Sequence, residues 1–263
     1  MYIGAGEDHM SKTPATPQAG SPDAKAGGFL AEPLDPLRYG HGMGSPLECD
    51  GLALGMIRRG ARVLDVGCGV GDFSATVRDR LGAEVTGIEP DAARAAEARR
   101  RGLTVSERVL EEVLADQAER MAGQFDVVLY MDVLEHLADP GAELRAARRA
   151  LAPGGAVIAS IPNVAHWSVR TELLRGRFDY ARYGIMDATH LRWFTARTVR
   201  TLFESAGLRV VEHRYSAGIH FDCYRRWPWR WLPGRVRRPL IVQGVRLRPH
   251  LFGAQHVVRA VSA

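Results

Sequence analysis

The 263-residue sequence has few cysteines, almost no lysine and no long apolar run. Its cysteines, Cys49, Cys68 and Cys223, form no CxxC pair and no cluster with histidine, which argues against a disulfide framework and a structural zinc site. No apolar stretch approaches the ~18 residues of a transmembrane helix. The first residues lack the apolar core of a secretory signal, so we expect a cytoplasmic protein.

Negative charge is missing from the C-terminal part of the chain. No Asp or Glu follows Asp222, whereas arginine recurs up to Arg259, so the net charge of +5 arises at this end. Within residues 223–250, arginines alternate with tryptophans. This Arg/Trp-rich segment has three interpretations: a solvent-exposed edge loop, a site of peripheral membrane contact, or a nucleic-acid site that uses phosphate contacts and stacking. Nucleic acid is disfavoured as a partner, because the motifs of base-modifying enzymes, N-P-P-Y and Pro-Cys, are missing.

The chain divides into a flexible segment and a long folded part. Residues 1–44 are rich in Pro, Gly, Ala and Ser without helical or strand periodicity, so we expect them to be disordered or flexible. Residues 45–263 form the expected domain, opened by a helix over 45–60 with Ser45 as its N-cap. Strands are expected at 62–67, 84–90, 103–107, 125–131, 156–162, 208–216 and 254–262, and helices at 71–82, 91–102, 139–152 and 195–207.

Strands that alternate with helices of this length need crossover connections. The pattern therefore predicts a doubly wound α/β fold with a mostly parallel sheet. Residues 164–194 interrupt the alternation with an aromatic and charged segment, which we call the insertion. Open α/β sheets build ligand sites from segments that follow the carboxyl ends of strands. We therefore expect the insertion to cover the site of an acceptor substrate.

The sequence VLDVGCGVGDF places Gly67, Gly69 and Gly71 between a strand and a helix. Glycines at this place let the backbone approach a nucleotide-like ligand, and the helix N-terminus offers free amides. A dinucleotide fingerprint would need Gly or Ala at position 72, where Asp72 stands. The acid before the first glycine, Asp65, suits a cationic ligand better than a pyrophosphate.

Four motifs in this order resemble the class I S-adenosylmethionine-dependent methyltransferases. They are VLDVGCGVGDF, GIEP with Glu89, FDVVLYMDVLEHLADP and LAPGGAVIASIPN, and the resemblance covers about residues 45–263. It implies a seven-stranded sheet of order 3-2-1-4-5-7-6 with the seventh strand antiparallel. It also implies S-adenosylmethionine as cofactor and S-adenosylhomocysteine as product.

The resemblance assigns cofactor-binding roles to several residues. Glu89 would bind both ribose hydroxyls, because a carboxylate accepts two hydrogen bonds at once. The family often has an adenine-contacting acid after the third strand, but this chain has Glu107, Arg108 and Val109 there, and we assign Val109. The other assignments are Asp65 to orient the glycine loop, Gly67 and Cys68 to face the amino-acid moiety with Gly69 and Gly71 in the same loop, and Met131 and Asp132 to lie near the methionine portion. Asp65 and Asp132 have capping of a loop or helix as their alternative role.

Methyl transfer to a hydroxyl needs a base, which directs attention to histidine. The first candidates are His136, in the LEH that follows the fourth strand, and His166 and His190 in the insertion, and His220 comes after them. His136 has a structural or cofactor-pocket role as its alternative. Candidate acceptor-binding residues in the insertion are Trp167, Arg170, Tyr183, Asp187 and Arg192. For Asp187, His190 and Arg192, the alternative is that they fix the insertion to the core.

The spacing Asp132-x-x-Glu135-His136 resembles a motif of ubiquinone-pathway O-methyltransferases that is linked to a divalent metal. A short cluster of this kind is more often a hydrogen-bond network, so no metal ligand is assigned. The sequence thus predicts a methyltransferase that modifies oxygen in a small molecule, such as a natural product, a quinone-like phenol or a sugar. Two alternatives stay open: a methyltransferase for RNA or another macromolecule, and a cofactor-binding scaffold without catalysis. Nothing in the sequence indicates an oligomeric state.

Overall fold

The computed structural model describes residues 45–226 and 229–263, so the predicted flexible segment 1–44 lies outside the described residues. Their centre is a seven-stranded sheet of order β3-β2-β1-β4-β5-β7-β6. β7 runs antiparallel to both of its neighbours, and the other pairs are parallel. The strands are β1 (Arg62–Val66), β2 (Glu84–Ile88), β3 (Thr104–Ser106), β4 (Phe125–Met131), β5 (Leu151–Pro162), β6 (Leu208–Tyr215) and β7 (Gln255–Ser262). The predicted fold class and strand order are confirmed.

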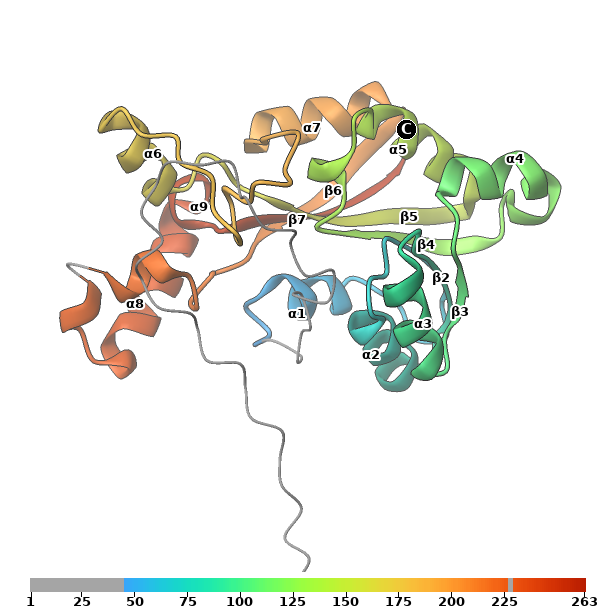
Figure 1. Cartoon of the computed structure of the whole chain (residues 1–263), viewed down its shortest axis with the longest axis horizontal. Helices are drawn as coiled ribbons and strands as arrows, with labels where there is room; N and C mark the ends of the chain where they lie inside the picture. The colour runs from blue at the N-terminus through green and yellow to red at the C-terminus, as the bar shows by residue number, and fades with distance from the viewer. Residues whose placement is uncertain (1–44, 227–228) are drawn as a thin grey trace, which may run out of the picture.

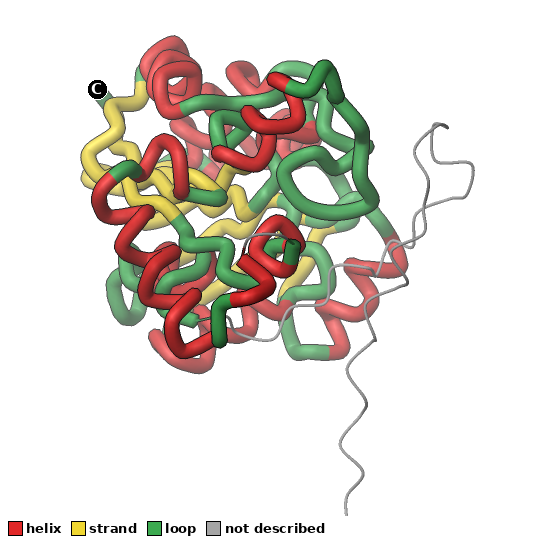
Figure 2. Tube along the Cα trace, turned by 90° about the vertical axis from the view of Figure 1, so that its left-hand side faces the viewer, coloured by secondary structure: helices red, strands yellow, loops and turns green. Residues whose placement is uncertain are grey.

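Helices cover both faces of the sheet, as Figures 1 and 2 show. One face packs against α1 (Cys49–Leu54), α2 (Asp72–Leu81) and α3 (Ala92–Arg100), and the other against α4 (Leu110–Met121), α5 (Pro140–Ala150) and α7 (Ala196–Ser205). Each face has its own apolar core, one around Val63 and Leu129 and the other around Leu64 and Val128. Neighbouring residues of one strand thus enter opposite cores, which explains why the middle of these strands is mostly apolar on both faces.

A group of short elements lies at the end of the sheet formed by β5, β7 and β6 (Figure 1). It comprises α6 (Trp167–Leu174), α8 (Gly234–Leu247), α9 (Pro249–Phe252) and the 3₁₀ turns η2 (Asp222–Arg225) and η3 (Trp229–Trp231), while η1 (Leu134–His136) follows β4. Within the described ranges, none of the helices has both the length and the apolar character needed to cross a membrane.

Two predicted elements were wrong in extent. The helix over 45–60 is only α1, and its N-cap is Glu48 rather than Ser45. Residues 45–48 instead form a turn in which the Glu48 amide donates to the Ser45 carbonyl at 2.8 Å. The Arg/Trp-rich segment is not a loop, because residues 234–247 form α8. Its apolar residues Ile241, Val242 and Val245 recur at helical spacing, and this signal was hidden by the arginines around them.

One helix and the start of one strand were not predicted from the sequence. α4 buries Leu110, Val113 and Leu114 at helical spacing, a pattern that the sequence does contain. β5 begins at Leu151 rather than at residue 156, and its pairing with β4 shifts register between Phe125 and Val127. The Pro-Gly-Gly that suggested a turn therefore lies within the strand, at this irregularity.

Candidate active site

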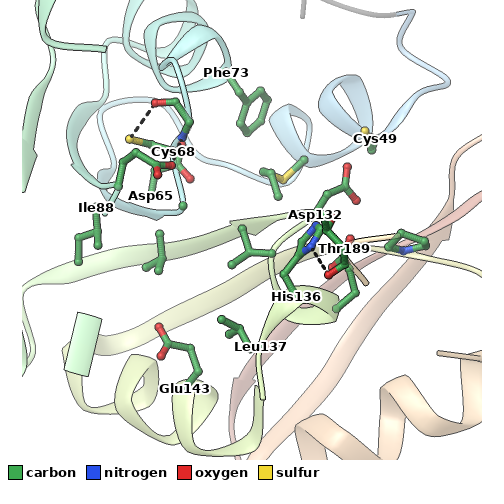
Figure 3. A pocket seen from close by; sticks show the side chains of 18 of the residues that line it. Cys49, Asp65, Cys68, Phe73, Ile88, Asp132, His136, Leu137, Glu143 and Thr189 are labelled. Carbon is green, nitrogen blue, oxygen red and sulfur yellow. Dashed lines mark hydrogen bonds between the residues drawn. The ribbon is translucent and has the colours of Figure 1, made fainter. Parts of the chain in front are cut away.

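A cavity of about 1530 Å³ opens at the carboxyl ends of the central strands. β1 and β4 are neighbours there, and the chain connections from them leave in opposite directions along the sheet. Doubly wound sheets bind ligands at such a switch point. Figure 3 shows Asp65 and Cys68 on one side of the cavity and Asp132, His136 and Thr189 on the other. The cavity therefore joins the predicted cofactor and acceptor sites.

The glycine loop, residues 67–71, forms one wall of the cavity. The amides of Gly67 and Cys68 both donate to the Ile88 carbonyl, at 2.7 and 3.1 Å, which ties the loop to the end of β2. Gly69 has φ +57°, and no atom lies within 4 Å of where its Cβ would be. The loop thus presents bare backbone to open space, as close approach of a ligand requires.

The Glu89 carboxylate lies directly beneath this loop. It is 3 % exposed, accepts from the Gly69 amide at 2.9 Å through Oε2, and accepts from the Asp91 amide at 3.0 Å through Oε1. Each oxygen retains a further lone pair, and the residue lines the cavity. A buried carboxylate with spare acceptor capacity beside bare backbone fits the ribose diol of an adenosyl cofactor.

Asp65 has a different partner from the one expected. Its Oδ2 accepts from the Ser74 hydroxyl at 2.5 Å, which connects β1 to α2 rather than to the glycine loop. Burial raises the pKa of Asp65 to about 7, although the Ser74 hydrogen bond acts in the opposite direction. The carboxylate that hydrogen-bonds the loop is that of Glu89.

Asp132 is held firmly at the end of β4. Its φ of 54° is the only left-handed value of a non-glycine residue within the described ranges. Its Oδ1 accepts from the Ser160 hydroxyl at 2.9 Å, and its carboxylate accepts from Gln255 Nε2 at 2.7 and 2.8 Å. Gln255 comes from β7 and lines the cavity, and no motif of the sequence indicated it.

Glu135, His136 and His190 form a cluster next to Asp132, in which Glu135 and His190 are buried and His136 is half-buried. His136 Nδ1 lies 3.1 Å from the Thr189 carbonyl, and His190 Nδ1 lies 3.0 Å from the Ile185 carbonyl. A carbonyl only accepts, so both Nδ1 atoms donate and each neutral ring keeps an unprotonated Nε2. The Glu135 carboxylate has no hydrogen-bond partner among the described residues, and burial raises its pKa well above the usual range.

The ligand atoms of these three residues lie within 4.8 Å of one another. Two imidazole nitrogens and a carboxylate are a donor set that suits a divalent transition metal, so the cluster fits such an ion. The sequence grouped Asp132 with Glu135 and His136, but in the structure His190 takes the place of Asp132 in this cluster. Asp132 stands outside it because Ser160 and Gln255 hold its carboxylate.

His166 lies away from the cavity, between α6 and η2. Its side chain is fully buried, with Nε2 at 3.2 Å from the Tyr224 hydroxyl and Nδ1 at 2.8 Å from the Ser168 hydroxyl. It also caps the N-terminus of α6 by accepting from the Ser168 amide. Burial lowers the pKa of His166 to about 4, so its ring is neutral near pH 7.

The predicted acceptor-binding residues of the insertion make contacts within the protein. The Asp187 carboxylate accepts from the Thr189 amide and hydroxyl at 2.8 and 2.6 Å, and the Arg192 guanidinium donates to the Ala138 carbonyl. The Arg192 bond leaves the insertion and favours the alternative in which this residue fixes it to the core, whereas the Asp187 bonds lie within the insertion itself. Trp167 donates to the Tyr224 hydroxyl at 3.3 Å, Arg170 donates to the Ala165 carbonyl at 2.6 Å, and Tyr183 is 59 % exposed.

None of the five predicted acceptor-binding residues is among the described residues that line the cavity. These five are Trp167, Arg170, Tyr183, Asp187 and Arg192. The insertion contributes other residues to the wall, and the segment after β6 contributes more. These residues are Gly184, Ile185, Thr189 and His190 from the insertion, and Gly218, His220 and Phe221 after β6. Apart from the two histidines, His190 and His220, they carry no signal that would have marked them in the sequence.

Comparison with known proteins supports the motifs. A family model described as a methyltransferase domain matches residues 48–213. The ubiquinone biosynthesis O-methyltransferase of Pseudomonas aeruginosa strain LESB58 is 44 % identical over 106 residues, which cover 40 % of this chain and 45 % of that protein. The chain thus spans about half the length of the first curated relatives. The enzyme of the same name from Cereibacter sphaeroides is 36 % identical over 188 residues, 65 % of this chain and 67 % of that one.

Solved structures agree on the fold. A methyltransferase from Archaeoglobus fulgidus has a TM-score of 0.53 and 18 % identity, covering 81 % of this chain and 94 % of that chain. The 1,6-didemethyltoxoflavin-N1-methyltransferase of Burkholderia thailandensis, solved with S-adenosylhomocysteine, has a TM-score of 0.51 and 17 % identity, covering 88 % and 79 %. The family model, the strand order and the glycine loop beside Glu89 all agree. The chain therefore belongs to the class I S-adenosylmethionine-dependent methyltransferases.

Proposed function

We propose that this chain transfers a methyl group to a hydroxyl oxygen of a small molecule, with His136 as the general base. One observation carries the proposal: His136 lines the cavity while its Nδ1 is fixed by the Thr189 carbonyl at 3.1 Å. The backbone contact sets the tautomer, so Nε2 is available to accept a proton. Neutral imidazole is the side chain best suited to this role near pH 7.

The cofactor would occupy the side of the cavity formed by β1 and β2. We assign the ribose diol to Glu89 and the amino-acid moiety to the loop of Gly67, Cys68, Gly69 and Gly71. Val109 would contact the adenine and Met131 the methionine portion, and both line the cavity. Asp132, locked by Ser160 and Gln255, would keep the end of β4 in place beside the methyl group.

The protein's part in the reaction is orientation and proton removal. When bound, the cofactor supplies a methyl group that its sulfonium already activates. His136 Nε2 would take the proton of the acceptor hydroxyl as that oxygen receives the methyl group. His190, whose ring touches that of His136, would hold it in place.

Two observations support the class of acceptor: the names of the curated relatives, and the residues that line the acceptor end of the cavity. The curated relatives are named ubiquinone biosynthesis O-methyltransferases, which supports a phenolic hydroxyl as the reacting group. The acceptor end combines apolar Ile185 and Phe221 with polar His220 and Gln255, which suits a ring with several oxygens. We therefore propose a quinone-like phenol first, and a natural product or sugar next.

The proposal is tested by binding and then by turnover. Isothermal titration with S-adenosylmethionine and S-adenosylhomocysteine should show binding that NAD does not reproduce. Methyl incorporation from labelled cofactor is then measured over catechols, other phenols, sugars and RNA. Incorporation into RNA alone would assign the macromolecular alternative, and cofactor binding without incorporation into any acceptor would favour a non-catalytic scaffold.

Metal dependence is tested separately on the same protein. A divalent ion held by Glu135, His136 and His190 would act as a Lewis acid on a bound hydroxyl and would occupy the nitrogen that our proposal uses as a base. We expect EDTA to leave methyl transfer unchanged. Loss of activity that Mg²⁺ or Zn²⁺ restores would show that His136 is a metal ligand instead.

A further inference from the structure

Helix α8 exposes a stripe of large apolar side chains. Val236 is 41 % exposed, Leu240 48 % and Leu247 67 %, and Trp231 just before the helix is 70 % exposed. Successive helical residues are about 100° apart, so positions 236, 240, 243 and 247 lie within an arc of about 60°. Three of these four residues are aliphatic, and the fourth is Gln243. The stripe therefore runs along α8 and is interrupted once, by Gln243.

The opposite side of α8 is anchored in the protein. Ile241 is 1 % exposed and packs with Tyr224 and Ala217, and Val242 and Val245 lie against the same cluster. This cluster also holds Phe221, which lines the cavity. α8 is thus fixed beside the acceptor end of the site, at the edge of the molecule, as Figure 1 shows.

Arginines flank the apolar stripe on both sides. By the same helical geometry, Arg237 lies on one side, and Arg235 and Arg246 lie on the other. The Arg237 guanidinium donates to the Tyr224 carbonyl at 3.1 Å, whereas Arg235 and Arg246 are exposed. In the chain that the structure describes, no carboxylate pairs with Arg235, Arg246 or Arg248. No acid follows Asp222 in the sequence, so nothing in the C-terminal segment neutralises this face. Next to it, the Arg230 guanidinium lies 4.8 Å from the centre of the Trp231 ring.

We propose that α8 and Trp231 dock on the surface of an anionic lipid bilayer. A helix that lies in the interface buries an apolar stripe at the headgroup boundary, while flanking arginines reach the phosphates and tryptophan lies at headgroup depth. Anionic lipid attracts each basic side chain near the surface. Nucleic acid would engage the arginines but leave Val236, Leu240 and Leu247 in water, so it accounts for only half of the surface.

The test is cosedimentation of the full chain with vesicles. We expect binding to phosphatidylcholine vesicles that contain phosphatidylglycerol, weakening with salt, and little binding to phosphatidylcholine alone. Leu240→Glu, and separately the triple variant Arg235→Gln, Arg246→Gln, Arg248→Gln, should each weaken binding by about tenfold or more. Matched controls are Val211→Glu, a 41 % exposed valine on β6, and the triple variant Arg80→Gln, Arg197→Gln, Arg209→Gln, all exposed arginines away from α8.

Three outcomes would overturn the proposal. Equal weakening by the matched controls would show that binding follows net charge and not α8. If the protein binds RNA and not vesicles, and Leu240→Glu leaves RNA binding unchanged, the arginines would be assigned to nucleic acid. The third outcome is that the protein does not bind vesicles, that the wild type is a dimer in sedimentation equilibrium, and that Leu240→Glu is a monomer. A second copy of the chain would then cover the stripe. As a control for folding, the thermal unfolding temperature of each variant is compared with that of the wild type. Equal temperatures show that the differences concern binding and not stability.

Discussion

The imidazole rings of His136 and His190 meet edge to face, with ring centroids 4.8 Å apart and planes inclined by 73°. His136 ends the 3₁₀ turn after β4, and His190 belongs to the insertion 54 residues later in the chain. Each ring is fixed through its Nδ1 by a carbonyl of the insertion. The insertion therefore sets both the tautomer and the orientation of the histidine that we propose as the base.

The first prediction separates His136, which lines the cavity, from His166, which is buried away from it. His136→Gln should lower kcat by about 10²- to 10⁴-fold, because a general base contributes that much, and should leave cofactor affinity within a few-fold. His166→Gln is the matched control, because His166 contacts Tyr224 and Ser168 and does not line the cavity. Equal loss of kcat in both folded variants would show that neither effect reports proton removal.

The second prediction concerns Glu89 and the cofactor. Glu89→Gln keeps one acceptor oxygen but loses the charge and the second acceptor, and hydrogen bonds to charged groups contribute about 1.5–3 kcal/mol. S-adenosylhomocysteine should therefore bind about 10- to 100-fold more weakly by isothermal titration. Glu107→Gln removes an exposed carboxylate that pairs with Arg99 and should leave the affinity unchanged. Unaltered binding to Glu89→Gln would remove the ribose assignment.

The fold was predictable because local patterns and topology agree. β1, β2 and β4 are short apolar runs, and Gly67, Gly69 and Gly71 separate the first of them from α2. Right-handed crossovers leave few arrangements for such a chain. Glu89 was predictable for the same reason, since it ends a strand that the topology places next to the glycine loop.

The acceptor side was not predictable to the same degree. Gln255 reaches Asp132 from β7, 123 residues away, and only the folded sheet brings the two together. In the insertion, the sequence alone does not distinguish a polar or aromatic residue that binds substrate from one that holds a loop in place. Asp187 and Arg192 make internal bonds, whereas Gly184 and Ile185, which carry no polar side chain, line the cavity.

The third prediction compares two glycines that share a left-handed backbone. Gly71 has φ +82°, and a Cβ there would lie 2.5 Å from Leu103 Cδ1 and 2.9 Å from Ala98 Cβ. Gly82 has φ +62° with nothing within 4 Å. Gly82→Ala should therefore lower the free energy of unfolding by about 1–2 kcal/mol, the backbone cost alone. Gly71→Ala should cost about 1–3 kcal/mol more in urea unfolding, because overpacking adds to it.

Equal losses in these two variants would show that Leu103 moves aside without cost. A cofactor titration on the folded Gly71→Ala protein adds a second measurement. Because Gly71 begins the turn into α2, affinity for S-adenosylhomocysteine should fall along with stability, whereas Gly82→Ala should bind as wild type does.

The last prediction is a pH dependence of stability. The pKa of His166 is lowered to about 4 by burial, so between about pH 6.5 and 4 the unfolded chain binds one proton that the folded protein does not. Stability therefore falls as the pH is lowered through this range, by about 1.4 kcal/mol per pH unit for this residue. His213 and His256, with pKa values lowered to about 4 and 3, act in the same direction.

Asp65 acts in the opposite direction, since a pKa raised to about 7 makes the folded protein bind the extra proton between about pH 4 and 7. Its contribution is common to wild type and His166→Gln, so the difference between the two proteins isolates His166. Urea unfolding at several pH values should give a slope that is smaller by about 1.4 kcal/mol per pH unit in His166→Gln. Identical slopes would mean that His166 takes up its proton equally in the folded and unfolded states, and hence that the cap in which its Nδ1 accepts from the Ser168 amide does not require the neutral ring.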